Sequence, residues 1–174
     1  MDKKAVIASL AFSHDSALLA SGSTDGSIRL WSVNTGECMR ILKGHLEPVG
    51  WVAFSHDSTM ILSINTSMDT ILRIWHTNLS ERVQVLKHHK GPVYELILSP
   101  DSRVIVTKAV EDTIILVWST ENGKSHALRG HQGFIGSAVF SHDSALLASA
   151  SDDATRIWRV TTGECIHTLQ GCNG

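Results

Sequence analysis

The sequence predicts an all-β fold in which four repeats of about 42 residues each form one four-stranded antiparallel sheet. Four tryptophans mark this period, because successive ones stand 44, 43 and 40 residues apart. A second marker, an apolar residue followed by Ser-(His or Pro)-Asp-Ser, recurs at steps of 42, 44 and 42 residues. No apolar stripe at helical spacing extends beyond a turn or two, which favours strands. The markers are Trp31, Trp75, Trp118 and Trp158, and Phe12, Phe54, Leu98 and Phe140.

Each repeat is expected to begin with a short apolar strand that ends in the Ser-(His or Pro)-Asp-Ser segment, whose residue types reverse a chain. These first strands are expected at Ile7–Phe12, Val49–Phe54, Val93–Leu98 and Ile135–Phe140. In the first repeat, three further strands are expected at residues 18–21, 28–31 and 39–42. The four repeats then occupy approximately residues 5–44, 46–88, 90–130 and 132–171 of a single domain, 1–174.

The turn before the fourth strand carries its own signal. Gly36, Gly123 and Gly163 each stand five residues after a tryptophan, so this turn is expected to need a positive φ. Ser80 holds the same position in the second repeat, which predicts a differently built turn there.

The composition narrows the class of protein. Hydrophobic residues make up 43% of the chain and charged residues 18%, which predicts a packed core rather than disorder. A net charge of −2 argues against nucleic-acid binding, and no apolar run approaches the ~20 residues of a membrane span. The first residues show no signal peptide, and three cysteines make no disulfide framework. We therefore expect a cytoplasmic protein.

The ten histidines do not predict a metal site, because none has the tight ligand spacing that zinc requires. No metal or other cofactor is expected. Ser-His-Asp occurs three times as adjacent residues, around His14, His56 and His142. Members of a catalytic triad converge in space with the His between the other two, whereas adjacent residues in a turn point apart. We therefore expect no catalytic residues and no enzymatic activity.

Taken together, four strands per repeat, a Gly-His at one end and a Trp at the other resemble the WD40 family of β-propellers over essentially the whole chain. The resemblance implies that a His, a Ser or Thr, an Asp and a Trp form a hydrogen-bonded tetrad in each blade. The sequence also departs from the family pattern, since no tryptophan is followed by Asp and the second repeat has two extra residues between Ser63 and Asp69.

Carried over residue by residue, the resemblance assigns one tetrad to each of the last three blades. They are His45, Ser63, Asp69 and Trp75; His89, Thr107, Asp112 and Trp118; and His131, Ser149, Trp158 with Asp153, or alternatively Asp152. The first blade has Ser21, Asp25 and Trp31, but Lys3 stands in the His position, so its network is expected to be incomplete.

Within the family, residues 35–38 and 162–171 are similar to the repeats of fungal NACHT–WD40 proteins of the heterokaryon-incompatibility type. Near-identity between repeats is also typical of those arrays, and residues 12–21 are identical to residues 140–149. This resemblance implies a recognition array of a fungal signalling or incompatibility receptor.

The fourth repeat is the candidate for the weakest sheet. It has one residue fewer between Asp153 and Trp158 than the other repeats have between their Asp and Trp. Thr155 therefore stands at the position of Ile28, Leu72 and Ile115 in the other repeats. Either a hydroxyl occupies an apolar position or the strand shifts and its alternation breaks.

Ring closure is the second open question, because four repeats leave no strand to complete another blade. An open arc, a tight four-bladed ring and half of an eight-bladed ring made by a dimer all fit. We expect a partial or open propeller that is a fragment of a longer array or that is completed by self-association.

Candidate partner-binding residues lie near the start of the first strands or just before the turn Asp. They are Trp51, Tyr94, Glu95, Thr24, Met68, Glu111 and Asp152. For Trp51, a partner anchor and a space-filling core residue are both open.

Three functions are consistent with these features. The first is a non-catalytic scaffold or recognition module that binds other proteins. The second is a small-ligand-binding or enzymatic propeller with a site in its central channel, although Glu95 is the single charged residue among the expected channel positions. The third is a decayed duplicate without present function.

Overall fold

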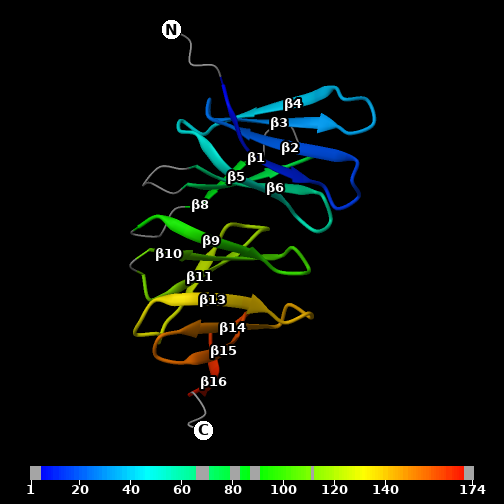
Figure 1. The fold of residues 1–174 in the computed structure, drawn as a ribbon. Coiled ribbons are helices and arrows are strands. Elements are labelled where there is room, and N and C mark those ends of the chain that lie inside the picture. The colour runs from blue at the N-terminus through cyan, green and yellow to red at the C-terminus, as the bar shows by residue number, and fades with distance from the viewer. Residues whose placement is uncertain (1–4, 66–70, 79–82, 87–90, 111, 171–174) are drawn as a thin grey trace. The chain divides into compact units, whose positions relative to one another are not determined.

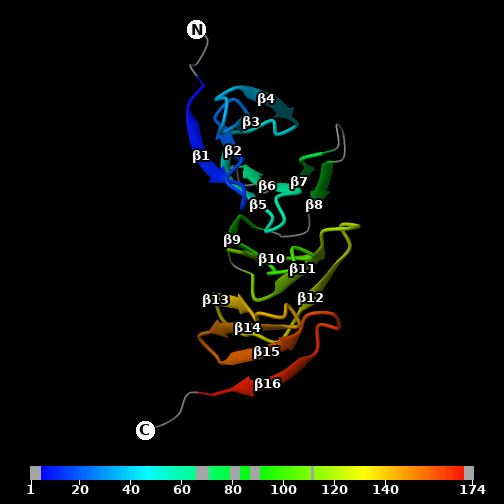
Figure 2. The ribbon, with the colours of Figure 1, turned by 90° about the vertical axis from the view of Figure 1, so that its right-hand side faces the viewer.

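The structure is a computed structural model, and it describes residues 5–65, 71–78, 83–86, 91–110 and 112–170. The chain divides into two compact units, Met1–His88 and His89–Gly174, and each unit is described by itself. Figures 1 and 2 show the first unit in blue to green and the second in green to red. No helix in the described part of the chain is long and apolar enough to cross a membrane.

The predicted all-β class is confirmed, because each unit holds two four-stranded antiparallel sheets whose strands pair in sequence order. We call the four sheets blades 1 to 4. Unit one contains blade 1, with β1 (Ile7–Phe12), β2 (Leu18–Ser23), β3 (Ser27–Ser32) and β4 (Cys38–Lys43), and blade 2, with β5 (Val49–Phe54), β6 (Met60–Asn65), β7 (Leu72–His76) and β8 (Val83–Leu86). Unit two contains blade 3, with β9 (Val93–Leu98), β10 (Val104–Ala109), β11 (Ile115–Ser119) and β12 (Ser125–Leu128), and blade 4, with β13 (Ile135–Phe140), β14 (Leu146–Ser151), β15 (Thr155–Arg159) and β16 (Cys165–Leu169).

The turn between the first and second strands has the same construction in every blade. In blade 1, Asp15 Oδ1 accepts hydrogen bonds from Ser13 Oγ at 2.6 Å and from Ala17 N at 3.0 Å. These bonds hold the pKa of Asp15 below its ordinary value. Ser16 adopts a φ of 59°, in the left-handed region that residues other than glycine seldom enter. The equivalent residues Ser58, Ser102 and Ser144 have φ values of 59°, 60° and 61°.

The glycines of the last turn have the backbone conformation that their spacing predicts. Gly36, Gly123 and Gly163 have φ values of 70°, 69° and 73°, so the expectation of a positive φ is confirmed. Ser80 lies outside the described residues, and its turn stays a prediction.

The core of unit one lies between its two sheets. We call the face of a blade that carries the third-strand tryptophan its tryptophan face, and the opposite face its aliphatic face. Trp75 and Val52, on the tryptophan face of blade 2, form one buried cluster with Ala20, Ile28 and Leu30 of the aliphatic face of blade 1. The two sheets therefore bury opposite faces against each other.

The core of unit two repeats this arrangement. Trp158 and Leu147, on the tryptophan face of blade 4, cluster with Val106, Ile115 and Val117 of the aliphatic face of blade 3. Each of these five side chains is at most 3% exposed. The same rule of packing thus appears twice in one chain.

The second and third strands of blade 4 keep their register although this repeat is one residue short before Trp158. β14 and β15 pair without a shift from Leu146–Arg159 to Ala150–Thr155. Of the two predicted outcomes, a hydroxyl in the apolar position is the one observed, and the shifted strand is wrong. Thr155 lies on the aliphatic face of blade 4, which no other blade of unit two covers. A lower stability of this sheet remains a prediction.

Candidate protein-interaction site

A chain of hydrogen bonds runs through blade 4 from the core to its surface. Trp158 Nε1 donates to Ser149 Oγ at 2.8 Å, and Ser149 Oγ lies 2.7 Å from His131 Nε2. His131 Nδ1 lies 2.9 Å from Asp153 Oδ1, and Arg156 Nη1 donates to Asp153 Oδ2 at 2.6 Å. His131 Nδ1 faces two groups of opposite character, the accepting carboxylate of Asp153 at 2.9 Å and the donating Arg156 Nη1 at 2.8 Å.

This series of hydrogen bonds has the order of a general-base relay, but a substrate could not reach it. Ser149 is 1% exposed, and its hydroxyl already bonds both the indole and the imidazole. Hydrogen bonds from His131 and then from Arg156 hold the pKa of Asp153 well below its ordinary value. The arrangement therefore ties β14, β15 and the segment before β13 together. It brings in Asp153, whereas Asp152 stays outside the network.

Blade 2 has the same hydrogen bonds from the tryptophan to the hydroxyl and from the hydroxyl to the histidine. Trp75 Nε1 donates to Ser63 Oγ at 2.8 Å, and Ser63 Oγ lies 2.8 Å from His45 Nε2. Burial first, and the neighbouring Arg73 guanidinium second, lower the pKa of His45 to about 4, so its ring is neutral at pH 7. His45 Nδ1 has no hydrogen-bond partner among the described residues, and the predicted Asp69 lies outside them.

Blade 3 shows a shorter part of the predicted tetrad. Trp118 Nε1 donates to Thr107 Oγ1 at 2.8 Å, which ties the third strand to the second. The predicted His89 lies outside the described residues. Asp112 accepts a hydrogen bond from Ile114 N at 3.2 Å, as expected for a residue that shapes the turn before β11.

Blade 1 keeps the indole–hydroxyl bond and uses its Asp differently. Trp31 Nε1 donates to Ser21 Oγ at 2.9 Å. Asp25 accepts hydrogen bonds from the hydroxyl and the backbone N–H of Ser27, which lower the pKa of Asp25 to about 2. No hydrogen bond within the described residues joins Asp25 to the Trp31–Ser21 pair, and Lys3 lies outside them.

Two of the predicted partner-binding residues lie in described parts of unit one. Trp51 is half-buried on β5, opposite Ile64. Thr24 is exposed, and its Oγ1 accepts a hydrogen bond from Val6 N at 2.9 Å. Met68 lies outside the described residues.

The predicted residues of unit two form an organised cluster at the junction of blades 3 and 4. Tyr94 donates from its hydroxyl to Ile135 O at 2.5 Å, and its ring stacks on Phe134 with 5.3 Å between centroids. Glu95 forms an ion pair with Lys108, whose Nζ also donates to Ile135 O at 3.2 Å and lies 5.3 Å from the centre of the Tyr94 ring. Burial, together with the Glu95 charge, raises the pKa of Tyr94 to about 12.

Lys108 and Phe134 were not among the residues singled out from the sequence. Lys108 is 1% exposed, which is rare for a lysine unless it is paired. A signal for it exists in the repeat pattern, because β10 pairs Lys108 with Glu95, and blades 1, 2 and 4 have no charge at either position. Phe134 has no comparable signal, since only the fold brings its loop beside β9.

Asp152 lies close to this cluster. Its Cβ is 3.1 Å from the position that a Cβ on Gly133 would occupy, and Gly133 directly precedes Phe134. Asp152 is exposed, and so are parts of Tyr94 and Phe134. We call Tyr94, Phe134 and Asp152 the aromatic patch. Glu111 lies outside the described residues.

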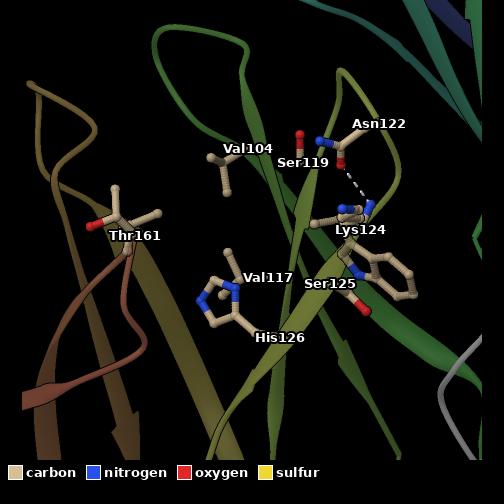
Figure 3. A pocket seen from close by; sticks show the side chains of 10 residues that line it. Val104, Val117, Ser119, Asn122, Lys124, Ser125, His126 and Thr161 are labelled. Atoms are coloured by element: carbon tan, nitrogen blue, oxygen red, sulfur yellow. Dashed lines mark hydrogen bonds between the residues drawn. The ribbon is translucent and has the colours of Figure 1, made fainter.

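A cavity of about 300 Å³ lies elsewhere in unit two, beside β11, β12 and the turn after β15 (Figure 3). Its walls include Val104, Val117 and Val160, and His126 also lines it. His126 Nε2 is buried with no hydrogen-bond partner among the described residues. Lys124, the other titratable lining residue, is exposed. Among the described residues, no three His, Cys, Asp or Glu side chains gather to hold a metal ion.

Comparison with known proteins agrees with this architecture. The family model described as "WD domain, G-beta repeat" matches residues 2–32, 36–76, 80–119 and 123–159. The chain is similar to the transcriptional corepressor LEUNIG_HOMOLOG of Arabidopsis thaliana, at 29% identity over 94% of this chain and 20% of that protein. It is also 31% identical to periodic tryptophan protein 2 of the same organism, over 87% of this chain and 17% of that protein. Nuclear distribution protein nudF 1 of Talaromyces marneffei is 30% identical over 95% of this chain and 27% of its own length. The chain therefore spans about a sixth to a quarter of the length of these relatives.

Proposed function

This chain belongs to the WD40-repeat family, and from that premise we propose that it is a non-catalytic interaction module whose protein partner binds the aromatic patch. WD40 domains generally act as scaffolds for protein interactions, and the names of the relatives point to varied processes. The proposal therefore concerns a mode of binding rather than a pathway.

The observation that carries the proposal is the exposed aromatic pair. Tyr94 is 38% exposed and Phe134 53% exposed, although the two rings stack on each other. The hydrogen bond of Tyr94 to Ile135 O and the cation of Lys108 beneath its ring hold the pair in place. Rigid aromatic side chains lose little conformational entropy on binding and dominate the energetics of many interfaces.

The charges around the pair favour a basic partner segment. Asp152 is exposed and lies beside Gly133, the residue before Phe134, and the Glu95 side chain, which forms an ion pair with Lys108, is 35% exposed. An Arg or Lys of a partner gains both from a carboxylate and from the face of an aromatic ring. We propose that the partner presents an apolar side chain next to an Arg or Lys.

The test is a binding assay with defined peptides. Short peptides that pair one Arg with one Leu or Phe are screened against the purified chain, and binders are measured by fluorescence anisotropy. Phe134→Ala is expected to weaken binding about tenfold, as for a moderate interface anchor. Leu46→Ala is the matched control, because Leu46 is 97% exposed in unit one, and it leaves binding unchanged. Equal binding of wild type and Phe134→Ala would contradict the proposal.

Two finer proposals concern context. Cys38 and Cys165 are free and exposed, which supports a reducing compartment such as the cytoplasm. A role as part of a fungal incompatibility receptor rests on the similarity of residues 35–38 and 162–171 and on the identity of residues 12–21 and 140–149, while the relatives described above belong to other groups.

The alternatives gain less support. A ligand site in a central channel would use Glu95, but this carboxylate is already paired with Lys108. A decayed duplicate would tolerate a broken network, whereas blade 4 joins His131, Ser149, Asp153 and Trp158 within hydrogen-bond distances.

A further inference from the structure

The tryptophan face of blade 1 is exposed. Phe12 is 63% exposed, Leu10 62% and Ile41 49%. The register of the sheet places all three on the face of Trp31, because Phe12 pairs through Leu19 with Trp31, and Leu10 through Ser21 and Arg29 with Ile41. Large exposed apolar patches on a soluble domain mark interaction surfaces.

The same face is covered in both blades that have a preceding blade in their own unit. Trp75 of blade 2 is 3% exposed and Trp158 of blade 4 is 1% exposed, whereas Trp31 is half-buried. In both cases, the covering surface is the aliphatic face of the preceding blade. Two junctions within the chain thus show that an aliphatic face packs against a tryptophan face.

One further aliphatic face is exposed in unit two. The row Val139, Ala148 and Ile157 crosses β13, β14 and β15 of blade 4, and it corresponds to Ala11, Ala20 and Leu30 of blade 1. Those residues of blade 1 belong to the packed junction with blade 2. In contrast, Val139 is 61% exposed, and Leu169 on the same face is 49% exposed.

We propose that the tryptophan face of blade 1 binds the aliphatic face of blade 4 in a second copy of this chain, head to tail. The contact repeats, between copies, the two junctions that exist within the chain. It deepens the proposed role as an interaction module by adding one partner, the chain itself, at a surface separate from the aromatic patch. Because different surfaces meet, the contact is heterologous.

Thr155 limits the strength of this contact. It stands on the aliphatic face of blade 4, where blade 1 has Ile28 and blade 3 has Ile115, both 0% exposed. A hydroxyl that loses water without gaining a partner weakens an apolar junction. The contact is therefore expected to be reversible, and Thr155→Ile to tighten it about fourfold, which corresponds to one buried methylene group.

The test uses the whole chain and two variants at exposed positions, Phe12→Glu and Val139→Glu. Wild type is expected to show masses above one chain by light scattering and sedimentation velocity at micromolar concentrations. Each variant alone has the mass of one chain, because one of the two matching faces carries a charge. An equimolar mixture of the two variants forms a species of two chains, because each contributes its intact face.

The controls separate this inference from the proposed function. Leu46→Glu, at a 97% exposed position outside both faces, keeps the wild-type mass. The peptide assay at Phe134 reports on the aromatic patch, so binding there with a monomeric wild type overturns the self-association alone. If the Val139→Glu variant self-associates alone, two tryptophan faces pair with each other, and the head-to-tail contact is wrong. The head-to-tail contact is also wrong if the equimolar mixture of the two variants keeps the mass of one chain.

Discussion

Blades 1 and 4 carry ten identical residues, 12–21 and 140–149, in different surroundings. Leu19 of blade 1 is half-buried, and the equivalent Leu147 is 0% exposed. Phe12 is 63% exposed, whereas Phe140 packs against the core of unit two. Identical local sequence therefore produces the same strands and turn in both blades. The neighbouring sheet alone decides how much of that sequence becomes core.

The two blades also differ in their polar networks. In blade 4 the indole–hydroxyl bond continues through His131 to Asp153, and in blade 1 the described part of the network ends at Ser21. Buried polar networks stabilise a fold when every member is satisfied. We therefore expect equivalent substitutions to cost more in blade 4.

The largest difference is expected for the tryptophans. Trp158→Ala should lower the free energy of unfolding by about 4 kcal/mol, because it removes a fully buried ring. Trp31→Ala should cost about 2 kcal/mol or less, since part of the Trp31 surface already contacts water in the folded state. Urea denaturation in the Val139→Glu background, which prevents self-association, measures both. Equal costs would show that the preceding sheet does not control the contribution of the ring.

The next effect concerns the hydroxyls that bond these tryptophans. Ser149→Ala leaves both the indole of Trp158 and the imidazole of His131 without their partner, at an expected cost of about 3 kcal/mol. Ser21→Ala removes one bond to a half-buried indole and should cost about 1 kcal/mol. The same denaturation experiment compares them. A larger loss for Ser21 would contradict the idea that the completed network matters.

The acid limb of the stability profile should also distinguish the blades. The folded-state pKa of Asp153 is lower than its unfolded value of 3.8, so its stabilising contribution is present above about pH 4 and is lost as the pH falls below that value. Asp25, with a pKa of about 2, loses its contribution between about pH 4 and 2. Asp153→Asn should therefore flatten the decline below pH 4 more than Asp25→Asn, as followed by thermal melting at pH 3 and pH 5. An unchanged slope in Asp153→Asn would be the contrary result.

His45 affects stability at a higher pH than the two aspartates do, and this part of the profile serves as an internal control. Its folded-state pKa of about 4 lies below the unfolded value of 6.5, so its contribution is lost as the pH falls from 6.5 to 4. Variants of Asp153 and Asp25 should leave this part of the profile unchanged.

The smallest effect is expected in the first turn of each blade. Ser144→Gly relieves a left-handed φ but loses the hydrogen bond that Asp101 N donates to Ser144 Oγ at 3.1 Å, with a net cost of about 1 kcal/mol. Ser16→Gly relieves the same strain at an exposed position and should change stability by at most about 0.5 kcal/mol. Thermal melting measures the difference, and a stabilised Ser144→Gly would refute the role of the bond to Asp101.

Much of the fold could be predicted because its signals are local and repeat. The first strand of each blade, the Asp-containing turn and the positive φ of Gly36, Gly123 and Gly163 all follow from residue type at fixed spacing. The candidate site was harder to predict. Tyr94 and Glu95 are marked by their departure from the repeat, but Phe134 meets Tyr94 only because blade 4 packs beside blade 3.

The sequence by itself determined the number of blades and the order of their strands, because the signals for strands and turns are local and repeat. The resemblance to the WD40 family indicated which residue types meet along Trp158, Ser149 and His131. Tertiary structure decided which copy of a repeated strand is core. Phe12 and Phe140 stand in identical segments, and the sheet packed against Phe140 is what makes it partly buried while Phe12 stays exposed. Burial depends on what lies across the junction, and a repeat does not encode its neighbour.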